Sequence, residues 1–154
     1  MNKTNAMRIL DKAKISYEEK EYPNDIPLDA ISVANYLNQP LSMVYKTLVT
    51  ANGHNYYVFC LPSDAELDLK VAAKEVNEKS LEMIPQKQLL PLTGYIHGGC
   101  SPVGMKKQFP TIIDLSAKEK EYIFVSGGKV GLQIKVNPQE LSELIQARFV
   151  KITR

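Results

Sequence analysis

The dipeptide Asn52-Gly53 constrains the fold of this chain more than any other feature, because it stands between two apolar stretches. Asn-Gly favours the tight turn of an antiparallel β-hairpin, since both residues tolerate the positive φ angles that the turn requires. Residues 44–50 and 56–61 are therefore expected to form paired strands. A second glycine pair, Gly127-Gly128, separates residues 122–126 from residues 130–136 and predicts another antiparallel hairpin.

Capping residues predict four helices around these hairpins. Each has a side-chain oxygen and precedes a stretch with apolar residues at helical spacing. The four caps are Thr4, Asp29, Asp68 and Asn137. The first helix is expected to run to about residue 14 and the third through residue 76. Four apolar residues are expected to form the buried face of the second helix: Ile31, Val33, Ala34 and Leu37.

Shorter segments complete the pattern. Strands are expected at residues 15–22, 81–84, 111–115 and 149–153. Pro85 is expected to begin a short helix that ends before Thr93-Gly94, and Ser116 with Glu119 indicates a capped turn. Helices and strands alternate irregularly, not as repeated βαβ units. The predicted fold class is α/β in the α+β sense: a mixed, curved, barrel-like sheet with helices packed around it.

Length and composition limit the possible classes of protein. A chain of 154 residues is expected to form one domain, residues 1–154, with a core that needs no staples. Two cysteines without a C-x-x-C pair supply neither a disulfide framework nor a zinc ligand set. No apolar run resembles a signal peptide or a membrane helix, so we expect a soluble protein of the cytoplasm. A net charge of +2 is too small for a general nucleic-acid binder, although it allows a few local phosphate contacts.

The loop of residues 98–104 contains three glycines and a proline. Ordering such a loop costs chain entropy, and loops of this kind persist where backbone N–H groups must approach a ligand or an oxyanion closely. A tight turn between strands explains the same residues, so both interpretations stay open. Met105 stands where a P-loop needs lysine, and Val103 stands where a nucleophile elbow needs glycine, which excludes both motifs.

Lys46 is unusual because it interrupts an apolar strand. Period-two alternation places it on the same face as Val44 and Leu48. Such a lysine either protects an exposed strand edge from aggregation or points into a polar cavity. The pattern alone favours the first interpretation.

Cys100 and His97 are weak candidates for a cysteine hydrolase. Residues three apart in a loop seldom face each other, and a small buried hydrophobe is the favoured interpretation of Cys100. His54, the other histidine, is expected at a solvated hairpin tip. Two histidines in these places do not indicate a Ser-His-Asp arrangement.

An ordered set of motifs along nearly the whole chain resembles the YbaK/ProX-type aminoacyl-tRNA deacylases, relatives of the editing domain inserted in bacterial prolyl-tRNA synthetases. The motifs are Val44-Tyr45-Lys46-Thr47-Leu48, Leu67-Asp68-Leu69-Lys70-Val71-Ala72, Thr93-Gly94-Tyr95, Gly98-Gly99, Ser101-Pro102, Gly104, Lys106-Lys107, Pro110, Val125-Ser126-Gly127-Gly128-Lys129 and Gly131-Leu132. The chain looks most like the YbaK branch, whose members remove cysteine from tRNA(Pro).

The resemblance implies a pocket for the terminal adenosine of a mischarged tRNA and its esterified amino acid, with no metal and no cofactor. It implies that Lys46 is the essential lysine. It also implies ten substrate-binding residues: Tyr22, Thr47, Gly98, Gly99, Cys100, Ser101, Pro102, Ser126, Gly127 and Gly128. In the YbaK branch the substrate's own thiol is thought to attack the ester, so no protein nucleophile is needed.

Several alternatives remain open. The substrate could be an ester of alanine or another small amino acid on tRNA(Pro), or the chain could be an inactive module that binds tRNA or a synthetase. Because the net charge is small, tRNA capture is expected to need help. The resemblance therefore suggests a ternary complex with prolyl-tRNA synthetase and no membrane partner.

Overall fold

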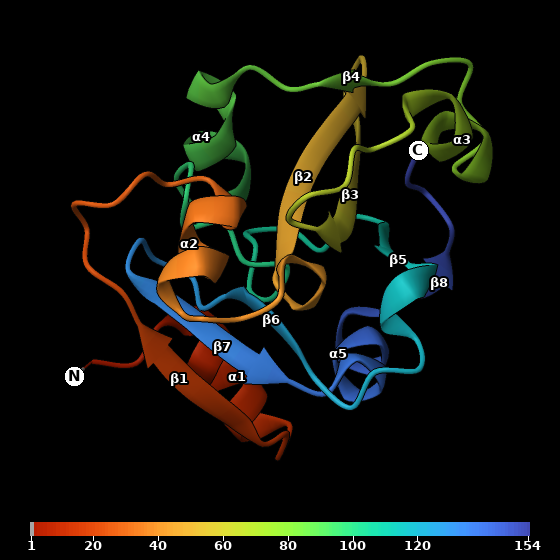
Figure 1. Ribbon diagram of the computed structural model, residues 1–154. Helices are drawn as coiled ribbons and strands as arrows, with labels where there is room; N and C mark the ends of the chain where they lie inside the picture. The colour runs from red at the N-terminus through yellow and green to blue at the C-terminus, as the bar shows by residue number, and fades with distance from the viewer. Residues whose placement is uncertain (1) are drawn as a thin grey trace.

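The computed structural model describes residues 2–154, and Figure 1 shows helices packed around two twisted sheets. The helices are α1 (Asn5–Lys12), α2 (Ala30–Tyr36), α3 (Leu69–Glu75), α4 (Leu89–Thr93) and α5 (Pro138–Ile145), with 3-10 turns η1 (Leu41–Met43), η2 (Gln86–Gln88) and η3 (Leu115–Ala117). The strands are β1 (Tyr17–Glu21), β2 (Tyr45–Asn52), β3 (Asn55–Pro62), β4 (Glu82–Met83), β5 (Thr111–Asp114), β6 (Ile123–Ser126), β7 (Leu132–Val136) and β8 (Arg148–Val150).

The strands form one antiparallel and one mixed sheet. The antiparallel sheet has the order β1-β7-β6, and the mixed sheet has the order β4-β2-β3-β5-β8. In the mixed sheet, β3 pairs with β5 and β5 with β8 in parallel. An isolated bridge between Val44 and Phe124 joins the two sheets. The α+β class and both predicted hairpins are confirmed.

The predicted helix caps are also confirmed. The hydroxyl of Thr4 accepts a hydrogen bond from the Met7 N–H at 3.2 Å. The side chains of Asp29, Asp68 and Asn137 each accept a bond from the first turn of their helix. These bonds satisfy N–H groups that have no partner inside a helix.

The predicted cap at Ser116 is wrong. The Asp114 carboxylate accepts from the Ser116 N–H at 3.1 Å and so caps η3. Ser116 cannot take that role because it lies inside η3, where its hydroxyl is hydrogen-bonded to the Tyr45 hydroxyl at 2.6 Å. Asp114 also accepts from the Ile152 N–H at 3.0 Å, which ties the C-terminal segment to β5.

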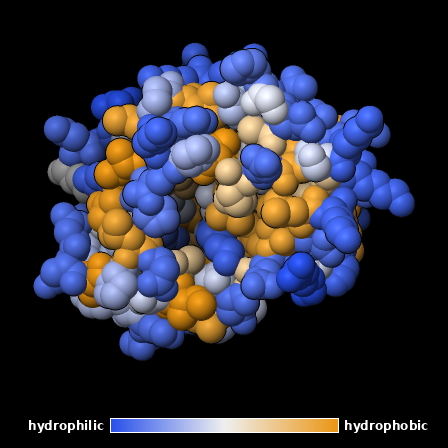
Figure 2. Space-filling model, turned by 90° about the horizontal axis from the view of Figure 1, so that it is seen from above, coloured by the Kyte–Doolittle hydropathy of each residue, from blue (hydrophilic) through white to orange (hydrophobic). Residues whose placement is uncertain are grey.

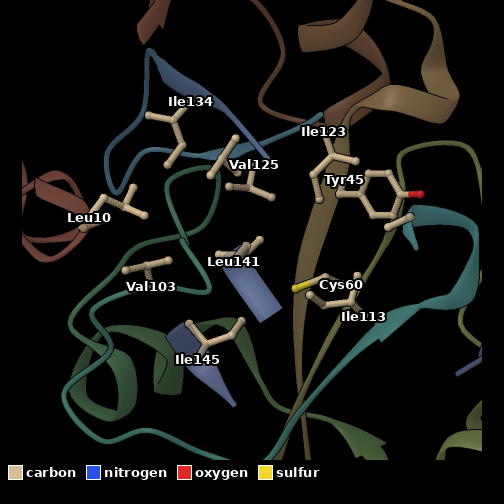
Figure 3. Packing of buried hydrophobic residues seen from close by; sticks show 13 residues of the cluster. Leu10, Tyr45, Cys60, Val103, Ile113, Ile123, Val125, Ile134, Leu141 and Ile145 are labelled. Atoms are coloured by element: carbon tan, nitrogen blue, oxygen red, sulfur yellow. The ribbon is translucent and has the colours of Figure 1, made fainter. Parts of the chain in front are cut away.

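The largest cluster of buried side chains lies between the two sheets and their helices (Figure 3). Alternation along β6 and β7 turns Val125 and Ile134 toward Leu10 of α1 and Leu141 of α5. The opposite face of the same sheet contacts α2, where Ala34 packs with Val44 and Phe124. The antiparallel sheet therefore has one face on the core and one face toward α2.

The predicted buried face of α2 is only partly correct. Val33 and Ala34 are buried, whereas Ile31 is exposed. None of the helices described, which lie within residues 2–154, has the length and apolarity to span a bilayer.

Candidate active site

A cavity of about 320 Å³ lies where the two sheets meet beneath α2. Its walls are the start of β2, the α2 segment, the loop around residue 98 and the outer face of β6 and β7. Six of the predicted site residues line it: Tyr22, Lys46, Thr47, Gly98, Cys100 and Ser126. The fold therefore gathers residues that are up to 104 positions apart in the sequence, from Tyr22 to Ser126.

Lys46 lies in the part of β2 that has a strand partner on only one edge. β2 is paired with β3 over its whole length, but with β4 only at Thr50 and Ala51. The Lys46 ammonium donates to the carbonyl of Ser63 at 3.2 Å. Burial lowers the pKa of Lys46 from its usual 10.5, while the nearby carboxylates of Asp64 and Glu66 oppose this shift.

The direction of the peptide groups along β2 decides which backbone N–H groups are free of strand pairing near the cavity. The Val44 carbonyl accepts from the Ser63 N–H at 2.8 Å on the β3 side, and the Val49 carbonyl accepts from the Ile84 N–H at 3.2 Å on the β4 side. Peptide groups in an antiparallel strand alternate between its two edges. The N–H of Thr47 therefore points, like the peptide group of Val49, toward the uncovered edge.

The glycine loop reaches the cavity through Gly98. This residue has φ of +85° and its carbonyl accepts from the Tyr22 hydroxyl at 3.4 Å. Its neighbour Gly99 lies against the turn of the second hairpin, where an added Cβ would come within 2.8 Å of the Val130 nitrogen. The Gly99 N–H donates to the Ile96 carbonyl at 2.9 Å, so it is already used within the loop.

The two thiols of the chain are poor nucleophiles. Burial raises the pKa of Cys100 to about 12 and that of Cys60 to about 12. Since the thiolate is the reactive form, both are protonated at neutral pH. Within residues 2–154, His, Cys, Asp and Glu side chains form no group of three that could hold a metal ion.

A model of the aminoacyl-tRNA editing domain matches residues 28–144 of the chain, which include β2, the glycine loop and the second hairpin. The chain belongs to the aminoacyl-tRNA editing family. This confirms the resemblance found in the sequence.

Individual relatives support the same family assignment. The chain is 44% identical over 153 residues to EbsC of Enterococcus faecalis, a protein assigned as a Cys-tRNA(Pro)/Cys-tRNA(Cys) deacylase. The match covers 98% of this chain and 93% of EbsC. The chain is 28% identical over 150 residues to a proline–tRNA ligase of Fervidobacterium nodosum, covering 91% of this chain and 25% of the ligase. A crystal structure described as a trans-editing enzyme for prolyl tRNA synthetase has the same fold, with a TM-score of 0.87, 22% identity, and coverage of 100% of this chain and 99% of that one.

The other residues that were predicted to form the site of this chain do not line the cavity: Gly99, Ser101, Pro102, Gly127 and Gly128. The buried Ser101 hydroxyl accepts from the Val103 N–H at 3.2 Å and shapes the loop. The Gly127 carbonyl accepts from the Thr4 hydroxyl at 2.6 Å, and the Gly128 N–H donates to the Ser126 hydroxyl at 3.2 Å. These residues hold the loop and the hairpin in place around the cavity.

Gln133 is a cavity residue that sequence reasoning missed. It lies on β7 directly opposite Ser126 of β6. It is only 6% exposed, and its Oε1 atom has no hydrogen-bond donor within residues 2–154. The signal was available, because Gln133 interrupts the apolar strand between Leu132 and Ile134 just as Lys46 interrupts its own.

Proposed function

We propose that this chain is a trans-editing hydrolase that cleaves the ester of mischarged aminoacyl-tRNA, with Cys-tRNA(Pro) as its main substrate. One observation carries the proposal: the partly buried Lys46 and its neighbour Thr47 both line a small cavity of an aminoacyl-tRNA editing domain. The assignment of EbsC, 44% identical over almost the whole chain, supports the choice of substrate.

The cavity supplies groups that suit ester cleavage. Attack on the ester builds negative charge on the carbonyl oxygen, and a nearby ammonium and fixed N–H groups stabilise that charge. We assign this role to Lys46 and to the backbone N–H of Thr47. Partial burial of Lys46 strengthens the interaction, because charges attract more strongly in a medium of low dielectric constant.

The nucleophile comes from the substrate. The cysteinyl thiol attacks its own ester carbonyl, the bond from that carbon to the ribose oxygen breaks, and the ribose oxygen takes up the thiol proton. Water then opens the resulting thiolactone. The protonated state of Cys60 and Cys100 supports this route, because neither offers a thiolate.

Apolar surface beside the cavity suits the rest of the substrate. Figure 2 shows apolar side chains gathered around a hollow on the face seen from above, with hydrophilic atoms inside the hollow. Exposed Leu28 and Ile31 line the cavity, and exposed Ile96 lies next to the glycine loop. We assign these residues to the terminal adenosine, whose base has a flat apolar face, and Tyr22 with Gly98 to its ribose.

A deacylation assay tests the proposal. Purified protein is incubated with Cys-tRNA(Pro), Ala-tRNA(Pro) and Pro-tRNA(Pro), and the remaining ester is measured over time. Selective loss of the cysteinyl ester is expected. In the Lys46→Ala variant the rate should fall by roughly 10²–10³-fold, the usual effect of losing one oxyanion donor. A melting temperature of the variant that is no lower than that of the wild type shows that the loss is chemical.

Other results of this assay favour other functions. Hydrolysis of the alanyl ester alone would move the substrate to a small amino acid without a thiol. Full activity of folded Lys46→Ala would remove the assigned role of the lysine. No hydrolysis of any ester, together with binding of the tRNA, would indicate a module that binds without catalysis.

We further propose that prolyl-tRNA synthetase presents the tRNA in a ternary complex. The net charge of +2 offers few phosphate contacts, and such contacts weaken as salt rises. Immobilised protein should retain the synthetase only when Cys-tRNA(Pro) is present. Failure to retain it at low salt would contradict the complex and leave the hydrolysis assay unaffected.

A further inference from the structure

Gln133 lines the cavity and carries a hydrogen-bond acceptor that has no partner among residues 2–154. Its Oε1 atom is buried, and no donor within residues 2–154 reaches it. A buried acceptor without a donor is destabilising, whereas a ligand that donates to it removes that penalty on binding. The atom is therefore suited to contact a donor group of the bound substrate.

The charges around the cavity indicate which group of the substrate donates to Gln133 Oε1. Lys46 supplies a positive charge from β2. Asp29 also lines the cavity, but its carboxylate accepts from the Ser32 N–H at 2.9 Å and from the Ser32 hydroxyl at 2.8 Å as the cap of α2. An aminoacyl ester carries one strong donor next to its carbonyl, the α-amine. Repulsion from Lys46 disfavours placing this amine beside the lysine.

Gln133 approaches from the other sheet. It lies on β7 of the antiparallel sheet, whereas Lys46 lies on β2 of the mixed sheet. We propose that Gln133 Oε1 accepts a hydrogen bond from the α-amine of the aminoacyl ester, so that the site selects esters of amino acids over acyl esters without an α-amine. This inference rests on the proposed function and adds a specificity residue to it.

The orientation of the substrate follows from the two contacts. Lys46 attracts the developing negative charge on the carbonyl oxygen, while Gln133 holds the amine on the neighbouring carbon. Two fixed contacts on adjacent groups restrict rotation about the bond between them. The side-chain amide of Gln133 carries no charge. It can therefore accept a hydrogen bond from the α-amine without also forming an ion pair with Lys46.

The test compares Cys-tRNA(Pro) with 3-mercaptopropionyl-tRNA(Pro), which keeps the thiol and lacks the α-amine. In Gln133→Met, which is similar in size, kcat/KM for the cysteinyl ester should fall by about tenfold, the effect of one bond to a charged donor. For the des-amino ester the same substitution should change kcat/KM little. Gln133→Glu, which keeps an acceptor, should retain the preference of the wild type for the cysteinyl ester.

Each outcome bears on the proposal. An exposed control variant, Gln88→Met in η2, should leave the ratio of the two rates unchanged. Equal losses on both esters in Gln133→Met would overturn the inference, because they would indicate a structural role or a contact to the thiol or the ribose. No loss on either ester would overturn it as well. If the wild type hydrolyses neither ester, the proposed function itself fails.

Discussion

Lys46 combines its proposed chemical role with an energetic penalty, because its ammonium is partly removed from water. A carbonyl acceptor at 3.2 Å and two carboxylates nearby compensate only in part, since burial is the largest influence on its pKa and lowers it from the usual 10.5. Such a group destabilises the fold while it serves the site, as functional groups often do. The penalty is measurable as a dependence of stability on pH.

Lys46→Met is expected to be more stable than the wild type at neutral pH. The folded wild type releases the Lys46 proton at a lower pH than the unfolded chain does, so the unfolded chain binds more protons up to pH 10.5. Wild-type stability therefore rises across that window relative to the variant. The difference in free energy of unfolding, measured with urea, should shrink as pH approaches 10.5; a constant difference would contradict the effect of burial.

Cys100→Ser is expected to keep most of the deacylation activity. The thiol lines the cavity, but its pKa of about 12 leaves it protonated at neutral pH, and the proposed reaction draws its nucleophile from the substrate. The assay is the hydrolysis of Cys-tRNA(Pro), with slow alkylation of Cys100 in the folded wild type as a second readout. Complete loss of turnover in a folded variant would restore the cysteine-hydrolase interpretation.

At the scale of elements, the cavity depends on the contact between the glycine loop and the turn of the second hairpin. Gly99 lies against the backbone of residues 129–130, and Gly127 leaves room for Leu132, whose Cδ2 would be 2.7 Å from an added Cβ. Side chains at these positions would force the two segments apart. The glycines thus set the position of Gly98 and Ser126, which line the cavity.

Gly99→Ala is expected to lower both stability and activity. The new Cβ would lie 2.8 Å from the Val130 nitrogen, and overpacking of this kind costs about 1–3 kcal/mol. Thermal unfolding and kcat/KM for Cys-tRNA(Pro) are the measurements. Gly53→Asn is the matched control, because Gly53 has open space around its Cα and a φ of +58°, which asparagine tolerates. Equal behaviour of the two variants would argue against a close contact at Gly99.

At the scale of the whole molecule, one core cluster holds the two sheets together. Ile123, Val125 and Ile134 come from the antiparallel sheet, whereas Cys60 and Ile113 come from the mixed sheet (Figure 3). The cavity lies at the junction of these sheets, so its shape depends on their relative position. Core packing and site geometry are therefore expected to be lost together.

Ile134→Ala is expected to destabilise the protein by about 2–5 kcal/mol, because it removes a fully buried side chain at the centre of this cluster. Unfolding followed by tyrosine fluorescence and by loss of deacylation should show one common transition at a lower urea concentration. Two separate transitions would indicate that the sheets unfold independently.

Much of the fold could be predicted because its signals are local. A cap needs only a side-chain oxygen beside the first turn, as at Thr4 and Asn137, and the Asn52-Gly53 turn needs only residues that accept positive φ. The cap at Asp114 was missed because the sequence pattern did not show that η3 begins at Leu115, which places Ser116 inside the turn. The arrangement of the strands in two sheets depends on contacts between distant segments, such as the Val44–Phe124 bridge, and a local pattern does not encode them.

The candidate site, like the fold, could be predicted from the sequence only in part. The sequence by itself determined the types of residue in the site, a lysine inside an apolar strand and two glycine-rich turns, and the family to which they belong. Only the tertiary structure decided which of them face the cavity: it brought in Gln133 and placed Ser101 and Gly127 behind the wall. The reason is physical, because the direction of a side chain depends on pairing and packing between distant segments, and no local pattern encodes that pairing.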